Sequence, residues 1–173
     1  MNGYPQNIVS LINQSLDLDQ ARIITSELLN KGLLGPHHPQ LCLTSRPDAI
    51  DPLYDGAGMS VHPERDFSVL NPLFEGSVFH SLLSEISEPY GRVRLMYLEP
   101  RKSYSIHRDV SRRIHYAIET NPQANLLVEM DRFRMWKLHI PADGRGYKVN
   151  TTLPHTAING GEVARIHLLI NLI

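Results

Sequence analysis

An alternation of apolar and polar residues near the end of the chain constrains the fold most strongly. Between positions 164 and 172 every even position is apolar, and the odd positions begin with Arg165 and His167. Successive side chains of a β-strand point to opposite faces of the sheet. The segment therefore predicts a strand with one dry face and one face that carries an arginine and a histidine.

A second segment, residues 113–118, repeats this pattern with Arg113 and His115 on its polar face. Apolar faces must be buried, so we expect both dry faces to pack against helices from the first part of the chain. An ordinary solvated face would more often carry lysine and glutamate. The paired Arg-x-His faces therefore favour the lining of a polar cavity.

Several further segments have the composition of short strands, and proline, glycine and asparagine residues separate them. Short strands with regular turns are typical of a double-sheet jelly roll or barrel. The fold that we expect is mainly β with N-terminal helices, a cupin-like double-stranded β-helix. The expected strands are Arg92–Leu98, Tyr104–His107, Arg113–Glu119, Asn125–Met130, Arg134–His139, Tyr147–Thr151, His155–Ala157 and Ala164–Leu172.

The first half of the chain has a different pattern. Apolar residues recur at helical spacing from 8 to 16 and again from 17 to 32, and a third helix is expected around Phe79–Ile86. Leu41–Thr44 is a candidate short strand within a proline-rich segment that runs from 35 to 78. A loop of that length can be a lid or a substrate-binding element, although plain scaffold is the simpler interpretation. We expect a single domain, 1–173, in which residues 1–91 form a scaffold on the β core of residues 92–173.

Composition excludes several functional classes. The formal net charge of −1 gives no reason to expect binding to nucleic acid or to an anionic membrane. The one cysteine, Cys42, cannot form an internal disulfide or a multi-cysteine metal site, which fits a reducing compartment. The sequence shows neither a signal-peptide pattern nor an apolar run long enough for a membrane span, so we expect a cytoplasmic protein.

The candidate chemistry lies in His107-Arg-Asp109, together with His155 further along the chain. Two histidines and one carboxylate on one face of an octahedron are the protein ligands of non-haem Fe(II) oxygenases, and they leave adjacent positions open. Arg165 follows His155 and could bind a carboxylate through two charge-assisted hydrogen bonds. These residues predict an iron site with an acidic co-substrate.

The segment Arg92–Ile173 resembles the aspartyl/asparaginyl β-hydroxylase-like branch of the Fe(II)/2-oxoglutarate dioxygenases, and it is also similar to some bacterial free-proline hydroxylases. The resemblance rests on four motifs, which are His107-Arg-Asp109, Arg113-Ile-His115 with Glu119-Thr-Asn-Pro122, Leu153-Pro-His155-Thr-Ala-Ile-Asn159, and Arg165-Ile-His167-Leu. The family fold is a double-stranded β-helix.

The resemblance implies that His107, Asp109 and His155 bind iron and that Arg165 holds the distal carboxylate of 2-oxoglutarate. It places Arg113 and His115 near the metal-bound end of that co-substrate. The implied activity is hydroxylation of an amino-acid carbon, in a free amino acid or a peptide, with O₂ consumed and succinate and CO₂ released. Two alternatives remain: a cupin-like metal-dependent isomerase, and a non-catalytic β-barrel that binds a small molecule. The sequence predicts no oligomeric state.

Overall fold

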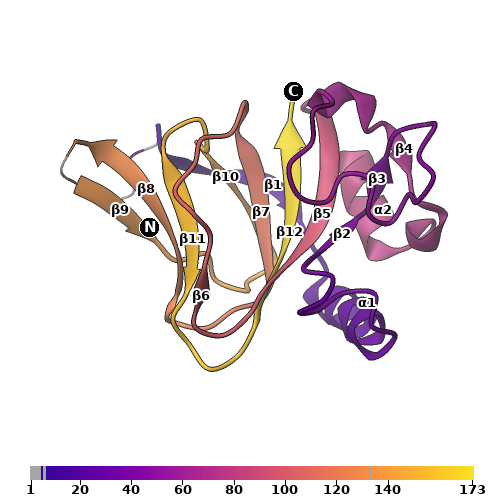
Figure 1. Cartoon of the computed structure of the whole chain (residues 1–173), viewed down its shortest axis with the longest axis horizontal. Coiled ribbons are helices and arrows are strands. Elements are labelled where there is room, and N and C mark those ends of the chain that lie inside the picture. Colours follow the sequence, from indigo (N-terminus) through magenta and orange to yellow (C-terminus); the bar gives the residue numbers. More distant parts are fainter. Residues whose placement is uncertain (1–4, 6, 133) are drawn as a thin grey trace.

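The computed structural model describes residues 5, 7–132 and 134–173. The fold is mainly β, with two α-helices and two facing β-sheets. Figure 1 shows three layers, with the smaller sheet on one side, the larger sheet in the middle and the helices on the far side. None of the helices in the described ranges combines the length and the apolar character that a membrane crossing requires.

The larger sheet has six strands in the order β1-β10-β7-β12-β5-β2. Their bounds are β1 Val9–Ser15, β10 Arg145–Val149, β7 Arg113–Glu119, β12 Arg165–Leu172, β5 Tyr90–Leu98 and β2 Gln40–Cys42. All five strand pairs are antiparallel. The strand predicted between 113 and 119 has these same bounds, and the one predicted from 164 begins one residue later.

The smaller sheet has four strands in the order β6-β11-β8-β9. Their bounds are β6 Lys102–Ser103, β11 His155–Asn159, β8 Ala124–Asp131 and β9 Arg134–Leu138. A further two-stranded sheet pairs β3 Thr44–Ser45 with β4 Val69–Leu70. Two short 3-10 helices, η1 Glu64–Asp66 and η2 Pro72–Phe74, lie in the segment that precedes the second helix.

The helices begin and end where the sequence indicates. Helix α1 spans Leu18–Asn30, and the Asp17 side chain caps it by accepting hydrogen bonds from the next turn's N–H groups, both at 3.1 Å. Gly32 follows the helix with a φ of 69°, a left-handed conformation that suits glycine. Helix α2 spans Val78–Glu85 and is capped by Ser77.

The helix predicted from 8 to 16 is wrong, because this segment forms strand β1. Val9 pairs with Val149 of β10, and the register becomes irregular between Leu11 and Ser15. Leu11 is an apolar residue that points outward, with 44% of its surface exposed. The adjacent apolar residues Leu11 and Ile12 break the alternation that would have identified a strand, and the strand partner lies far away in the sequence.

The strand predicted at Tyr104–His107 is also wrong as a regular element. Strand β6 ends at Ser103, and beyond it the chain makes only an isolated bridge between His107 and His155. The segment still follows β11, because Tyr104 N donates to the Ala157 carbonyl at 3.0 Å. The extended conformation is therefore retained without a continuous ladder.

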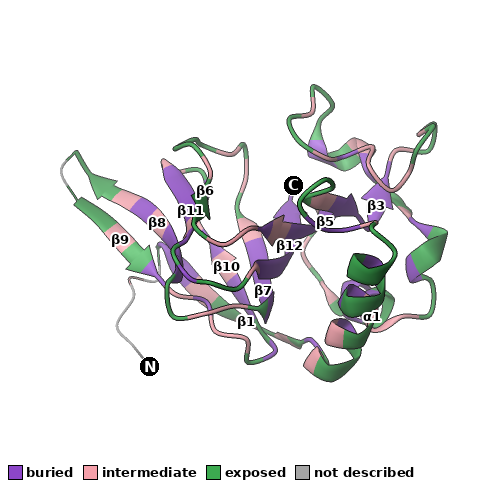
Figure 2. Ribbon diagram, turned by 60° about the horizontal axis from the view of Figure 1, so that its bottom comes forward, coloured by how far each residue is buried: buried purple, intermediate pink, exposed green. Residues whose placement is uncertain are grey.

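Two cores lie on opposite faces of the larger sheet. The first lies between the sheet and the helices, and it contains Ile114, Tyr116 and Ile118 of β7 with the even positions of β12. This confirms the expected packing of the dry strand faces. The second core lies between the sheets and includes Val128 and Leu138. Figure 2 shows β7 and β12 as mostly buried, whereas much of α1 faces solvent.

Candidate metal centre

Three predicted metal ligands come together between the two sheets. One ligand atom from each of His107, Asp109 and His155 lies within 4.8 Å of the other two. Nε2 of His155 is 3.3 Å from Asp109 Oδ2, and Nε2 of His107 is 3.8 Å from Asp109 Oδ1. Metal–ligand bonds of about 2.1 Å at right angles put neighbouring ligand atoms about 3 Å apart, so the observed separations suit one metal ion.

Backbone hydrogen bonds bring the two ligand-bearing segments together. His107 N donates to the His155 carbonyl at 3.0 Å, and His155 N donates to the His107 carbonyl at 2.8 Å. Asp109 N donates to the Thr151 carbonyl at 2.9 Å. The loop that carries His107 and Asp109 is thus held against the start of β11, where His155 lies.

The hydrogen bonds of the two imidazoles fix their tautomers. His107 Nδ1 lies 2.8 Å from the Ser105 carbonyl, and His155 Nδ1 lies 3.0 Å from the Leu153 carbonyl. A carbonyl only accepts hydrogen bonds, so each Nδ1 carries the proton and donates it. Each Nε2 then presents a lone pair toward Asp109, which is the arrangement that a metal ligand needs.

Asp109 is held in the ionised form. Arg113, at the start of β7, contacts Asp109 Oδ1 through a guanidinium nitrogen at 2.5 Å. Burial favours the neutral acid, but the Arg113 guanidinium beside the carboxylate outweighs this, so the pKa of Asp109 is lowered. Asp109 Oδ2 is buried and accepts no hydrogen bond. An anionic oxygen that lies 3.3 Å from the unprotonated Nε2 of His155 and accepts no hydrogen bond fits a bound cation.

Arg165 and His115 lie on the same inner face of the larger sheet as Arg113. Arg165 is buried, and its Nη2 lies 2.9 Å from His167 Nδ1. Among the described residues, no carboxylate lies within ion-pair distance of Arg165. Burial lowers the pKa of Arg165 to about 10, so the side chain remains a cation at neutral pH. A buried, unpaired guanidinium is a ready receptor for an anion.

His115 lies near both His155 and Arg165. Burial first, and then the charges of Arg165 and Arg113, lower its pKa well below the ordinary value, so the ring is neutral. Both ring nitrogens are buried without a hydrogen-bond partner. The ring is therefore free to donate one hydrogen bond and accept another on a bound molecule.

Tyr104 belongs to this site, although no sequence pattern indicated it. Its hydroxyl is buried without a partner, and it lies close enough to Arg165 for their charges to interact. Burial raises the pKa of this hydroxyl, so it stays protonated and can donate a hydrogen bond. Only the folded structure brings Tyr104 to Arg165, since the two lie on different elements of the chain.

Comparisons with known proteins give a likeness of fold. No family model and no curated protein sequence matches the chain. Among solved structures, a Pseudomonas putida prolyl-4-hydroxylase matches with a TM-score of 0.54 at 11% identity, over 96% of this chain and 88% of that one. A non-heme monooxygenase, ThoJ in complex with nickel, matches with a TM-score of 0.53 at 10% identity, over 96% of this chain and 74% of that one.

A third structure, a 2OG-Fe(II) oxygenase family oxidoreductase from Burkholderia pseudomallei, matches more narrowly. The TM-score is 0.43 at 11% identity, over 54% of this chain and 47% of that one, so the match spans about half of either protein. At these identities the comparisons show the fold alone. The roles of the individual side chains follow from the geometry described above and not from the comparisons.

Proposed function

We propose that the protein is an Fe(II)- and 2-oxoglutarate-dependent dioxygenase that hydroxylates a carbon atom of an amino acid, free or within a peptide. The two facing sheets would form a double-stranded β-helix. The observation that carries the proposal is the convergence of His107, Asp109 and His155, in which both imidazole Nε2 atoms lie near the carboxylate and one carboxylate oxygen accepts no hydrogen bond. This donor set suits Fe(II) and would leave adjacent positions open.

The inner face of the larger sheet supports a place for 2-oxoglutarate. Arg165 has no acidic partner, and the protonated Tyr104 hydroxyl lies close to it, so together they would bind the distal carboxylate. His115 lies near both Arg165 and His155, and its neutral ring would donate a hydrogen bond to the metal-bound end. Arg113 would orient Asp109 and add positive charge at that end.

When bound, Fe(II) with 2-oxoglutarate and O₂ supplies the oxidising chemistry that places one oxygen atom in a C–H bond and releases succinate and CO₂. The protein binds, orients and shields the reactants. Arg165, His115 and His155 are each at most 3% exposed, so water is largely excluded from the surface that faces the co-substrate. The carboxylate of Asp109 stays charged because the Arg113 guanidinium lowers its pKa.

An anaerobic titration with Fe(II) and 2-oxoglutarate tests this proposal. We expect a visible charge-transfer band that requires both components. A metal-dependent isomerase would bind the metal without needing the keto acid, and a non-catalytic barrel would bind neither. Absence of the band in metal-loaded protein would contradict the proposal.

The substrate search then uses succinate release. The protein is incubated in air with Fe(II), 2-oxoglutarate and pools of free amino acids or peptides, and products are detected by mass. We expect a product that has gained one oxygen atom. Neither nucleic acid nor a membrane surface is among the proposed partners, and the proposed place of action is the cytoplasm, in keeping with a buried, unpaired Cys42.

A further inference from the structure

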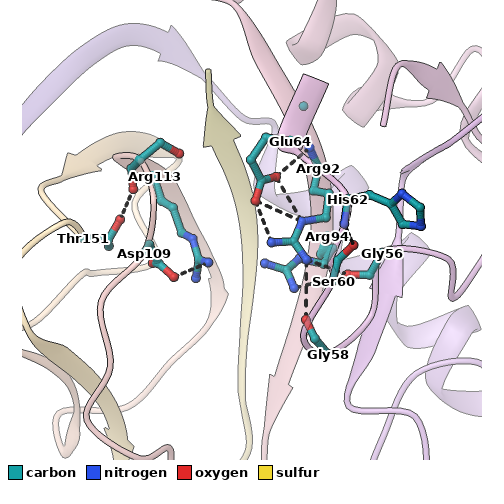
Figure 3. Close-up of polar contacts among 12 residues, drawn as sticks. Gly56, Gly58, Ser60, His62, Glu64, Arg92, Arg94, Asp109, Arg113 and Thr151 are labelled. Carbon is teal, nitrogen blue, oxygen red and sulfur yellow. Dashed lines mark hydrogen bonds and ion pairs between the residues drawn. The ribbon is translucent and has the colours of Figure 1, made fainter. Parts of the chain in front are cut away.

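A second group of arginines lies on the inner face of the larger sheet, beyond the metal centre. Arg92 and Arg94 belong to β5, and Arg113 belongs to β7. Strand β12 runs between them, with Leu169 paired to Arg94 on one side and Asn171 paired to Arg113 on the other. Figure 3 shows Arg92 and Arg94 on one side of this strand, and Arg113 with Asp109 on the other side.

Two of these three arginines have a carboxylate partner. Arg92 forms a buried ion pair with Glu64 of η1 at 2.6 Å, with three guanidinium–carboxylate contacts in all. Arg113 pairs with the candidate metal ligand Asp109 at 2.5 Å. The group therefore holds three positive charges and two negative charges, and the unmatched charge belongs to Arg94.

Arg94 contacts only neutral oxygen atoms. One of its terminal nitrogens donates to Gln40 Oε1 at 2.9 Å and, at a longer 3.4 Å, to the Gly56 carbonyl. Its Nε is buried without a hydrogen-bond partner. Only 3% of the residue is exposed, and no carboxylate among the described residues forms an ion pair with it.

The surroundings of Arg94 oppose its charge. Burial, and then repulsion from Arg113 and Arg92, lower its pKa to about 9. The side chain nevertheless remains a cation at neutral pH. A neutral side chain would satisfy Gln40 and Gly56 without this electrostatic cost, so their contacts alone do not account for an arginine here.

We propose that Arg94 binds a carboxylate group of the substrate, so that the enzyme acts on a carboxylate-bearing molecule held between β5 and the metal centre. This inference rests on the proposed function and specifies the substrate class. One unmatched positive charge suits a monoanion. Adjacent strands lie about 4.8 Å apart, so β5 and β7 are separated by about 10 Å, which a small molecule can span.

The position of Arg94 under the long proline-rich segment is consistent with this role. The Gly56 carbonyl accepts hydrogen bonds from Arg92 and Arg94, and the Gly58 carbonyl accepts one from Arg92. Gln40 Oε1 also accepts a hydrogen bond from Gly58 N at 2.8 Å. The segment between 35 and 78 would therefore form one wall of the substrate site. Gln40 keeps this second donor if Arg94 is replaced.

Ligand binding to the full chain, measured by saturation-transfer NMR, tests the inference. The probes are the free L-amino acids, their α-amides, aspartate and glutamate capped at both ends, and inorganic phosphate. Each probe is measured with Ni(II) and 2-oxoglutarate present and again without them. We expect at least one carboxylate probe to bind and its amide to fail. A free acid that binds identifies an α-carboxylate, and a capped acidic residue that binds identifies a side-chain carboxylate.

The variants Arg94→Gln and Arg94→Lys decide whether Arg94 is the receptor. Arg94→Gln is expected to bind the probe about thirtyfold more weakly or worse, and Arg94→Lys to recover part of the affinity through its charge. The exposed Arg101→Gln is the matched control and should bind as the wild type does. Equal binding by Arg94→Gln, binding of phosphate but no carboxylate, or no binding by the wild type would each overturn the inference.

Thermal melting separates a binding role from a structural one. Because Arg94 is an uncompensated buried cation, Arg94→Gln should melt at or above the wild-type temperature, whereas a structural arginine would leave the variant less stable. The outcomes for the two proposals also differ. If carboxylate binding requires Arg94 but no Fe(II)–2-oxoglutarate band appears, only the oxygenase proposal is contradicted. If the band appears but no carboxylate probe binds, only the proposed role of Arg94 is contradicted.

Discussion

At the scale of single residues, unsatisfied polar atoms gather around the candidate metal centre. The hydroxyl of Tyr104, both ring nitrogens of His115 and one oxygen of Asp109 are buried without hydrogen-bond partners. Buried polar groups in folded proteins are nearly always partnered. Arg92 and Glu64 follow that rule, whereas a few scattered buried atoms, such as Thr120 Oγ1 and Asn125 Oδ1, also have no hydrogen-bond partner. Such a concentration of unmet groups is typical of a surface that is completed by ligands.

Replacing His155 should remove the metal. His155→Ala deletes one of three proposed ligands, so we expect its affinity for Fe(II) to fall by more than the roughly 10–100-fold that loss of an outer partner costs. His167→Ala is the matched control, because His167 is equally buried but hydrogen-bonds to Arg165 and to none of the three proposed ligands. Anaerobic equilibrium binding of Fe(II) measures both. Wild-type affinity in His155→Ala would remove that residue from the centre.

Replacing Arg165 should affect the co-substrate and not the metal. Arg165→Gln leaves a carboxylate without its charged partner, a loss of about 2–5 kcal/mol, so the 2-oxoglutarate concentration for half-saturation should rise at least about thirtyfold. Arg165→Lys keeps the charge without the planar guanidinium, so its half-saturation concentration should lie between those of the wild type and Arg165→Gln. The Fe(II)–2-oxoglutarate band measures this directly. An unchanged half-saturation concentration in Arg165→Gln would contradict the assignment.

At the scale of elements, local patterns predicted the strands that have one dry face and missed those that depend on distant partners. The alternation in β12 and β7 is visible in the local sequence, because one face of each strand packs in the apolar core and the other carries polar residues. Strand β1 carries an outward Leu11 and pairs with β10, so its short apolar pattern was compatible with a helix. The same limit hid the role proposed for Arg94, because a buried charge without a partner is recognisable only when all its neighbours are known.

The ion pair between η1 and β5 should make stability fall in acid. Burial raises the pKa of Glu64, but the hydrogen bonds from Arg92 and Asn171 outweigh this, so its pKa lies below the ordinary value of 4.5. A carboxyl whose pKa is depressed in the folded state contributes stability above the unfolded pKa and loses it as the pH falls through the folded pKa. Urea unfolding should therefore show a loss below about pH 4.5 that is absent in Glu64→Gln.

At neutral pH, Glu64→Gln should cost about 3–5 kcal/mol of unfolding free energy, because it leaves Arg92 buried and unpaired. The matched control is Glu162→Gln, which breaks an ion pair of the same 2.6 Å length between side chains that are 73% and 75% exposed. That exposed pair should contribute at most about 1 kcal/mol. Equal losses in the two variants would contradict the electrostatic account.

A close backbone approach also fixes η1 on β5. A Cβ atom at Gly91 would lie 1.9 Å from the Glu64 carbonyl oxygen, a backbone atom that cannot move aside cheaply. Gly91→Ala should therefore lower the unfolding free energy by at least about 1–3 kcal/mol in urea denaturation. Gly160→Ala is the control, since its nearest contact would be an ordinary 3.5 Å. A Gly91→Ala variant as stable as Gly160→Ala would show that the contact is not limiting.

At the scale of the whole molecule, the two faces of the larger sheet have different roles. One of its faces packs on the helices through an apolar core, and the other carries the arginines and histidines toward the smaller sheet. The motif His107-Arg-Asp109 and the Arg-x-His faces made this division predictable from sequence. The long segment between 35 and 78 gave no such indication, because its contacts with β5 depend on backbone carbonyls that every residue type has.

A crystal structure of the protein grown anaerobically with Mn(II), as a redox-stable substitute for Fe(II), and 2-oxoglutarate tests the central claim most directly. We expect one metal ion at about 2.2 Å from Nε2 of His107, Nε2 of His155 and a carboxylate oxygen of Asp109. The distal carboxylate of 2-oxoglutarate should lie on Arg165. A metal ion bound elsewhere, or a co-substrate that avoids Arg165, would contradict the account.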